Sequence, residues 1–199
     1  MSEDVVAQLA STSPGRRILS GHSPVFFDTY YCGMRWAPHR ERWLSLFEEM
    51  QTEASMTRQK GHLLLLAPRD HGKTEALITY TARAICQNRD VRILWISASA
   101  GQAEKRMRRV KALLESDEIK ADWCSDPGAG FRPWRESDEQ KWGATQVYVA
   151  RTLQSVDPTI EAVGSGGAVT GGHFDIILCD DLEDDRTTYT AGQRSKTRE

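Results

Sequence analysis

Short apolar runs alternate with longer amphipathic segments along the chain. Three of these runs are almost continuously apolar, at residues 62–67, 91–97 and 175–180. Runs of this length are typical of strands that are buried on both faces of a parallel sheet. Two further short strands are predicted at 146–150 and 159–163. Strands that alternate with helices predict an α/β fold with a mainly parallel sheet.

Helical periodicity fills the intervals between the predicted strands. Pro38 suits the first turn of a helix whose apolar face is formed by Trp43, Leu44, Phe47 and Met50. A second helix is predicted from residue 73 to about 87. A third is predicted to end near residue 116, with Ser99 as its N-cap.

The pattern divides the chain into three regions. Residues 1–24 are rich in Ser, Gly and Pro and show no clear period, which predicts a flexible lead-in. Residues 25–60 are expected to form a helical N-terminal segment. Residues 61–199 are expected to form the α/β core, in which 117–143 is polar and turn-rich.

Composition excludes several classes of protein. The chain has 26 basic and 28 acidic residues, so its net charge is −2 and any contact with nucleic acid must come from a local patch. The four cysteines form no C-x-x-C pair, which argues against a zinc site or a disulfide scaffold. The N-terminus lacks the pattern of a signal peptide, and the apolar runs are too short to span a bilayer. A reduced, soluble, cytoplasmic protein is therefore expected.

The most informative segment is LAPRDHGKTE at 66–75. An apolar run leads into Gly72-Lys73-Thr74 and then into a predicted helix, which is the context of a phosphate-binding loop. Gly72 would let the backbone approach phosphates, Lys73 would place a positive charge on them, and Thr74 would offer a hydroxyl to Mg²⁺. Ala67 replaces the first glycine of the usual pattern. The alternative is a solvated turn before a helix.

A pair of acids follows the last predicted strand. Asp180 and Asp181 come directly after the apolar residues 176–179. In phosphoryl-transfer enzymes such acids hold Mg²⁺ and polarise the attacking water. The alternative is an acid-rich loop at 180–185 that merely solvates a strand end.

A basic stretch at 104–111 offers a candidate contact to DNA or to a neighbouring subunit. At helical spacing Lys105, Arg108 and Arg109 share one face, while Met107, Val110 and Leu114 share the apolar side. Arg106 and Lys111 complete the candidate set. The alternative is the solvated face of an amphipathic helix. Base stacking and packing are likewise both open for Trp123, Trp134 and Trp142.

The order of four segments resembles the ATPase domain of tailed-phage terminase large subunits, the motors that package viral DNA. The resemblance runs from about Trp36 to the C-terminus and is carried by 67–74, 92–105, 157–175 and 176–181. It implies a P-loop NTPase of the RecA/helicase-like ASCE type with ATP and Mg²⁺ as cofactors. A motor of this kind needs a further strand for its coupling motif and a nuclease domain. The chain is therefore expected to be a fragment or split gene product, incomplete at its C-terminus and without nuclease activity.

The resemblance also implies roles by position. Lys73 and Thr74 would bind triphosphate and Mg²⁺, and Arg69 would stabilise charge on the transferring phosphoryl group. Asp180 would be the metal acid. The catalytic acid would be Asp181, with Glu183 as the alternative because P-loop motors usually use Glu. The remaining nucleotide-binding residues implied are Pro68, Asp70, His71, Gly72, and, from the adenine-contact segment 36–40, His39 and Arg40.

The function that these features predict is ATP hydrolysis that powers translocation of double-stranded viral DNA into a procapsid. The expected partners are double-stranded DNA, a portal protein and a small terminase subunit, with a homo-oligomeric ring and no membrane association. The expected location is the cytoplasm of an infected bacterial host. Two alternatives remain open: another DNA-dependent P-loop ATPase of helicase type, or a nucleotide-binding assembly module without turnover of its own.

Overall fold

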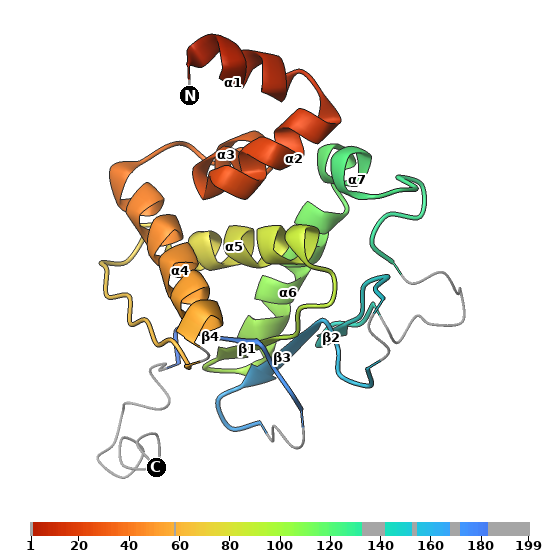
Figure 1. Ribbon diagram of the computed structural model, residues 1–199. Helices are drawn as coiled ribbons and strands as arrows, with labels where there is room; N and C mark the ends of the chain where they lie inside the picture. Colours follow the sequence, from red (N-terminus) through yellow and green to blue (C-terminus); the bar gives the residue numbers. More distant parts are fainter. Residues whose placement is uncertain (1, 58, 133–141, 153–154, 168–171, 183–199) are drawn as a thin grey trace. The chain divides into compact units, whose positions relative to one another are not determined.

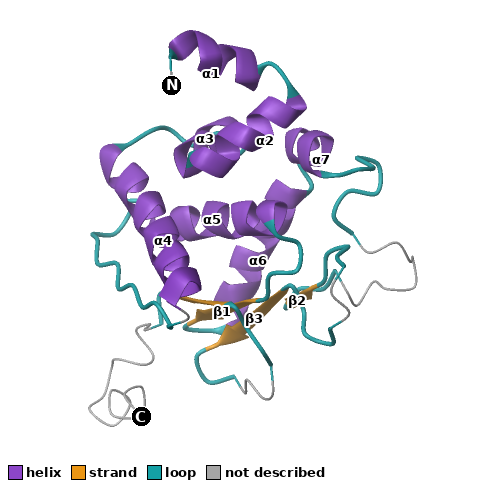
Figure 2. Ribbon diagram, in the orientation of Figure 1, coloured by secondary structure: helices purple, strands orange, loops and turns teal. Residues whose placement is uncertain are grey.

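A computed structural model describes residues 2–57, 59–132, 142–152, 155–167 and 172–182 (Figure 1). The chain divides into two compact units. The first unit combines residues 1–87 with 112–130, and the second combines 88–111 with 131–199. The fold is mixed α/β, with a mostly parallel sheet, as predicted (Figure 2).

The described part of the first unit is helical. Its helices are α1 (Glu3–Ala10), α2 (Ser13–His22), α3 (Pro24–Tyr30), α4 (Pro38–Thr57), α5 (Lys73–Gln87) and α7 (Asp117–Trp123). Helix α3 packs against α4 and α5, while α2 packs against α1, α3 and α7. None of the helices in the described ranges is both long and apolar enough to cross a membrane.

Most residues of the lead-in predicted over 1–24 form the helices α1 and α2, although the sequence there shows no clear period. Both α2 and α3 begin with proline in the first turn and with a hydroxyl cap. The Thr12 hydroxyl accepts a hydrogen bond from the Gly15 N–H at 3.2 Å, and the Ser23 hydroxyl accepts one from Phe26 at 3.1 Å. The Ser and Pro residues that suggested flexibility are therefore helix starts.

A buried arginine on α5 links this helix to α2 and α4. Arg83 is 3% exposed and donates from Nε to the Ser20 carbonyl at 2.8 Å and from Nη2 to the Gly21 carbonyl at 3.2 Å. Its Nη1 pairs with the Glu48 carboxylate. Each donor group of the guanidinium thus has an acceptor, as a buried charge requires.

The second unit contains the sheet. Its strands are β1 (Ile93–Ser97), β2 (Gln146–Val147), β3 (Ile160–Gly164) and β4 (Ile176–Asp180), in the order β2-β3-β1-β4. The last three in this order are parallel, and β2 is antiparallel to β3. Helix α6 (Ala100–Leu114) follows β1, and the Ser99 hydroxyl accepts a hydrogen bond from the Gln102 N–H, which confirms the predicted cap.

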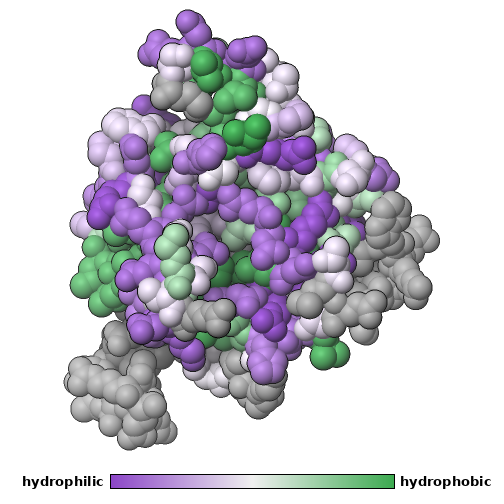
Figure 3. Space-filling view, viewed as in Figure 1, coloured by the Kyte–Doolittle hydropathy of each residue, from purple (hydrophilic) through white to green (hydrophobic). Residues whose placement is uncertain are grey.

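The apolar run at 62–67 is not a strand, so this prediction is wrong. Leu64 is 81% exposed and Leu66 is 83% exposed. Figure 3 shows hydrophobic surface on the left, the side on which Figure 1 draws the connection from α4 to α5 that contains this segment. A strand needs a hydrogen-bonded neighbour as well as apolar side chains, and none of the described strand pairs includes 62–67.

Other element boundaries also differ from the prediction. Strand β2 is shorter than the predicted strand at 146–150, whereas α4 begins at Pro38 as predicted. Helix α7 lies in the stretch predicted to be polar and irregular. Its start carries an N-cap, because the Ser116 hydroxyl accepts from the Ile119 N–H at 3.4 Å, and Asp117 and Glu118 follow in the first turn.

The buried carboxylate of Asp122 makes the stability of the first unit dependent on pH. Burial opposes its ionisation, but hydrogen bonds from Arg16 at 2.6 Å and from the Tyr31 hydroxyl at 2.6 Å outweigh that cost and lower the pKa of Asp122. A carboxyl group whose pKa is lower in the folded protein stabilises the fold above its unfolded pKa. That contribution is lost as the pH falls through the folded value.

We expect Asp122→Asn to lower the free energy of unfolding at neutral pH by about 3 kcal/mol, because Arg16 loses its charged partner. The difference between variant and parent should shrink as the pH falls below about 3.8, the ordinary pKa of the carboxyl group. Urea unfolding followed by circular dichroism at several pH values measures both. A difference that stays constant with pH would contradict the role of this ion pair.

Candidate functional site

The candidate phosphate loop belongs to the first unit and leads directly into α5. Asp70 (φ 62°) and Gly72 (φ 78°) both have left-handed backbone conformations. Asp tolerates this region better than most residues, and Gly adopts it without steric cost. The Gly72 carbonyl then accepts the Ala76 N–H at 2.9 Å, which starts α5. The loop therefore turns sharply at Gly72, and the next residue, Lys73, is the first residue of α5.

Lys73 closes the loop on itself. Its Nζ donates to the carbonyl of Ala67 at 2.5 Å and to the carbonyl of Pro68 at 2.8 Å. Lys73 and Thr74 occupy the first turn of α5, where backbone N–H groups and the helix dipole favour negative charge. The ammonium group of Lys73 and the hydroxyl of Thr74 thus lie on consecutive residues in the first turn of α5.

Helix α4 places a histidine beside the loop. The rings of His39 and His71 lie 5.8 Å apart, and His39 also contacts Trp43 with 4.9 Å between centroids. His71 Nδ1 lies 2.8 Å from the Arg69 carbonyl oxygen, and the Arg69 side chain is exposed. The structure therefore brings the predicted residue His39 next to the loop.

Arg40 also lies beside the loop, and its guanidinium makes hydrogen bonds to other groups of the protein. It is 6% exposed, forms an ion pair with Asp28 and donates to the Gly72 carbonyl at 3.2 Å. The resemblance placed Arg40 among nucleotide contacts. In the structure it contacts the backbone of the loop, and a contact with nucleotide stays a prediction.

The acid pair belongs to the second unit and lies at the carboxyl end of β4. Asp180 is 4% exposed and accepts from Arg106 Nε at 2.9 Å. Asp181 is exposed, has a left-handed backbone (φ 49°), and lies 3.8 Å from Arg106 Nη2. The Asp181 carbonyl accepts from the Ala98 N–H at 3.0 Å, which ties the end of β4 to the end of β1.

The carboxyl ends of the three parallel strands meet at one edge of the sheet. Ser97 is paired in register with Gly164 and with Asp180. Ser165 extends this edge, since its N–H donates to the Ser97 carbonyl at 2.8 Å. A Cβ at Gly164 would lie 2.7 Å from the Ala100 backbone nitrogen, so glycine allows the close approach to the start of α6. Ligands of parallel α/β sheets bind at this edge.

The basic residues of α6 divide into two sets. Lys105, Arg108 and Arg109 are exposed, while Met107, Val110 and Leu114 are buried, as the amphipathic pattern predicts. The other two basic side chains are engaged inside the second unit. Arg106 pairs with Asp180, and Lys111 donates to the carbonyls of Trp142 and Gly143 at 3.3 and 3.1 Å.

The remaining candidates are placed as follows. Trp123 packs against Phe27 and Tyr31, with centroids 6.3 and 6.5 Å apart, which supports the packing alternative for this residue. Trp134 and the alternative catalytic acid Glu183 lie outside the described residues. So do residues 168–171, which belong to the segment 157–175 that carries part of the resemblance.

The candidate metal ligands fit Mg²⁺ chemically. Each unit contains an oxygen group of the kind that Mg²⁺ prefers: the Thr74 hydroxyl in the first unit and the Asp180 carboxylate in the second. In nucleotide sites this ion is held by one or two protein oxygens together with substrate phosphates and water. A single strong carboxylate would therefore suffice.

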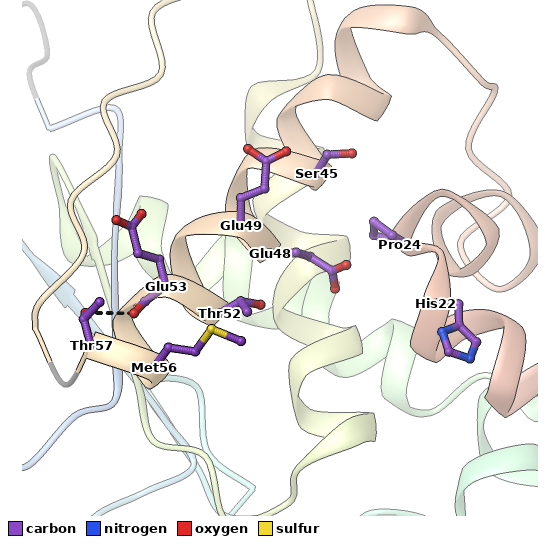
Figure 4. A pocket seen from close by; sticks show the side chains of 9 residues that line it. All are labelled: His22, Pro24, Ser45, Glu48, Glu49, Thr52, Glu53, Met56 and Thr57. Carbon is purple, nitrogen blue, oxygen red and sulfur yellow. Dashed lines mark hydrogen bonds between the residues drawn. The ribbon is translucent and has the colours of Figure 1, made fainter.

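A surface pocket of about 580 Å³ lies in the first unit. It follows α4 and is lined by carboxylates and hydroxyl groups together with His22, Pro24 and Met56 (Figure 4). No residue predicted to bind nucleotide lines it. Its lining residues are His22, Pro24, Ser45, Glu48, Glu49, Thr52, Glu53, Met56 and Thr57.

Sequence reasoning missed two supporting contacts. Asp28 carried no motif, and its role follows only from its pairing with Arg40. Arg106 is among the predicted DNA or subunit contacts, although its position between Lys105 and the apolar Met107 is a weak sign that it lies at the border of the buried side.

No protein-family model matches the chain, and no curated protein matches it significantly.

We expect Arg106→Gln to lower the free energy of unfolding by about 3 kcal/mol, because buried Asp180 loses its charged partner. The neighbouring exposed residue offers a matched control, and Lys105→Gln should change stability by less than about 0.5 kcal/mol. Urea unfolding measures both. Equal effects of the two substitutions would contradict the buried pairing of Arg106.

Proposed function

We propose that the chain binds and hydrolyses ATP as the ATPase part of a DNA-packaging motor of the terminase large-subunit type. The P-loop NTPase fold of ASCE type is part of this proposal. The observation that carries it is the loop at 67–74. Gly72 takes a left-handed conformation immediately before α5, and Lys73 and Thr74 form the first turn of that helix. This order of groups is what phosphate binding at a helix N-terminus requires.

The acid pair supports the same proposal. A buried carboxylate at the carboxyl end of β4, followed by an exposed second acid, has the chemistry to hold Mg²⁺ and to polarise a water. Asp180 would be the metal ligand and Asp181 the catalytic acid. Arg69, with its exposed side chain inside the loop, would stabilise charge on the transferring phosphoryl group.

The motor function rests on the resemblance and on the exposed basic residues of α6. Lys105, Arg108 and Arg109 present positive charge that could contact DNA phosphates. Double-stranded DNA, a portal protein and a small terminase subunit would be the partners. The site of action would be the cytoplasm of an infected bacterium.

We expect Lys73→Ala to lower ATP turnover about 100-fold or more, because the variant loses the positive charge on the phosphates. The measurement is release of inorganic phosphate from Mg²⁺-ATP by the full chain, with and without double-stranded DNA and the other motor components. Arg17→Ala, at an exposed residue of α2, serves as the control for a general loss of positive charge. Undiminished turnover in Lys73→Ala would overturn the proposed function, and binding without turnover by the parent would favour an assembly module.

We expect Arg69→Ala to leave nucleotide affinity largely intact and to slow turnover about 1,000-fold, as removal of a catalytic arginine does in related chemistry. Equilibrium binding of a fluorescent ATP analogue and single-turnover hydrolysis separate the two effects. Equal turnover in variant and parent would remove Arg69 from the catalytic residues.

A further inference from the structure

We propose that the buried ion pair between Asp28 and Arg40 is the positioning device of the phosphate loop, so that α3 and α4 set the geometry of the nucleotide site. The inference rests on the proposed function of residues 67–74. It assigns Arg40 to the support of the loop, a role different from nucleotide contact.

The ion pair is bidentate and almost completely buried. Arg40 is 6% exposed and Asp28 is 2% exposed. Arg40 Nε donates to Asp28 Oδ2 at 2.5 Å, and Nη2 donates to Oδ1 at 2.6 Å. Two parallel bonds between planar groups fix the orientation of the guanidinium as well as its position. The Asp28 carboxylate on α3 therefore fixes the direction in which the Arg40 guanidinium points.

The guanidinium of Arg40 also donates to the loop and to α5. Its Nη1 donates to the Gly72 carbonyl at 3.2 Å, and Nη2 also donates to the Thr79 hydroxyl at 3.3 Å. The Gly72 carbonyl is the acceptor that also begins α5 through the Ala76 N–H. One side chain thus joins α3, α4, the loop and α5 at the residue that precedes Lys73.

The contact between Arg40 and Gly72 affects the position of Lys73 and Thr74. Gly72 has left-handed backbone, and a Cβ placed there would lie 3.4 Å from Arg40 Nη1. The glycine therefore lies against the guanidinium with no side chain between them. A shift of its carbonyl moves the start of α5 and with it the ammonium and hydroxyl groups of the next two residues. Small displacements of such groups have large effects on rate.

The same unit provides a matched control for simple loss of stability. Arg83 is 3% exposed and pairs with Glu48, so it resembles Arg40 in burial and in charge pairing. Its other contacts within the described residues go to the carbonyls of Ser20 and Gly21, which lie on α2 and outside the loop. Replacing either arginine by lysine keeps the charge but removes the planar fork.

The experiment compares Arg40→Lys, Asp28→Asn and Arg83→Lys with the parent, each as the full chain at a temperature at which circular dichroism shows it folded. The first readout is hydrogen–deuterium exchange of peptides covering 66–76. The second is equilibrium binding of a fluorescent ATP analogue with Mg²⁺. Asp28→Asn is nearly isosteric, so it tests the pair even if Arg40→Lys does not fold.

We expect Arg40→Lys and Asp28→Asn to speed exchange in 66–76 about tenfold and to weaken nucleotide binding about tenfold, the size of effect that supporting residues have on a bound group. Arg83→Lys should lower the melting temperature without either change. Unchanged exchange in both pair variants, or an equal change in Arg83→Lys, would overturn the inference. If the pair variants loosen the loop but the parent binds no nucleotide, the proposed function fails while the positioning of the loop by the ion pair stands.

Discussion

A buried guanidinium must find a carboxylate and enough acceptors, and the first unit is organised around this requirement. Arg40 meets it with Asp28, the Gly72 carbonyl and the Thr79 hydroxyl. Because these acceptors come from α3, the loop and α5, the arginine can be buried only when all three are in place. The demand for charge compensation therefore links the N-terminal helices to the candidate loop more strongly than apolar contact alone, which has no direction.

The second unit applies the same constraint to the acids. Asp180 is buried at the end of β4, and Arg106 is the cation that its carboxylate faces. The next residue, Asp181, has a left-handed backbone, and its carbonyl accepts a hydrogen bond from the Ala98 N–H. Each part of the candidate site is thus held by an arginine that does not belong to the motif it supports.

These supporting arginines explain what the sequence could and could not predict. Local signals were sufficient for α5 and α6, because Gly72 and Ser99 mark their starts, and for the parallel strands, because their apolar runs are short and bounded. The run at 62–67 carried the same signal without becoming a strand, since strand pairing is a property of neighbours. The pairs of Arg40 and Arg106 join residues 12 and 74 positions apart, and no spacing rule connects them.

The charged groups of the candidate site already have partners, which constrains how a ligand could bind. Lys73 donates to two neutral carbonyls, and Asp180 faces the positive charge of Arg106. Hydrogen bonds between an ammonium group and phosphate are roughly twice as strong as bonds between neutral groups, so a phosphate could compete successfully for Lys73. A divalent cation alone would meet Arg106 as a like charge beside Asp180. Within the first unit an anion would give Lys73 a charged partner, and within the second unit a cation at Asp180 would have to compete with Arg106.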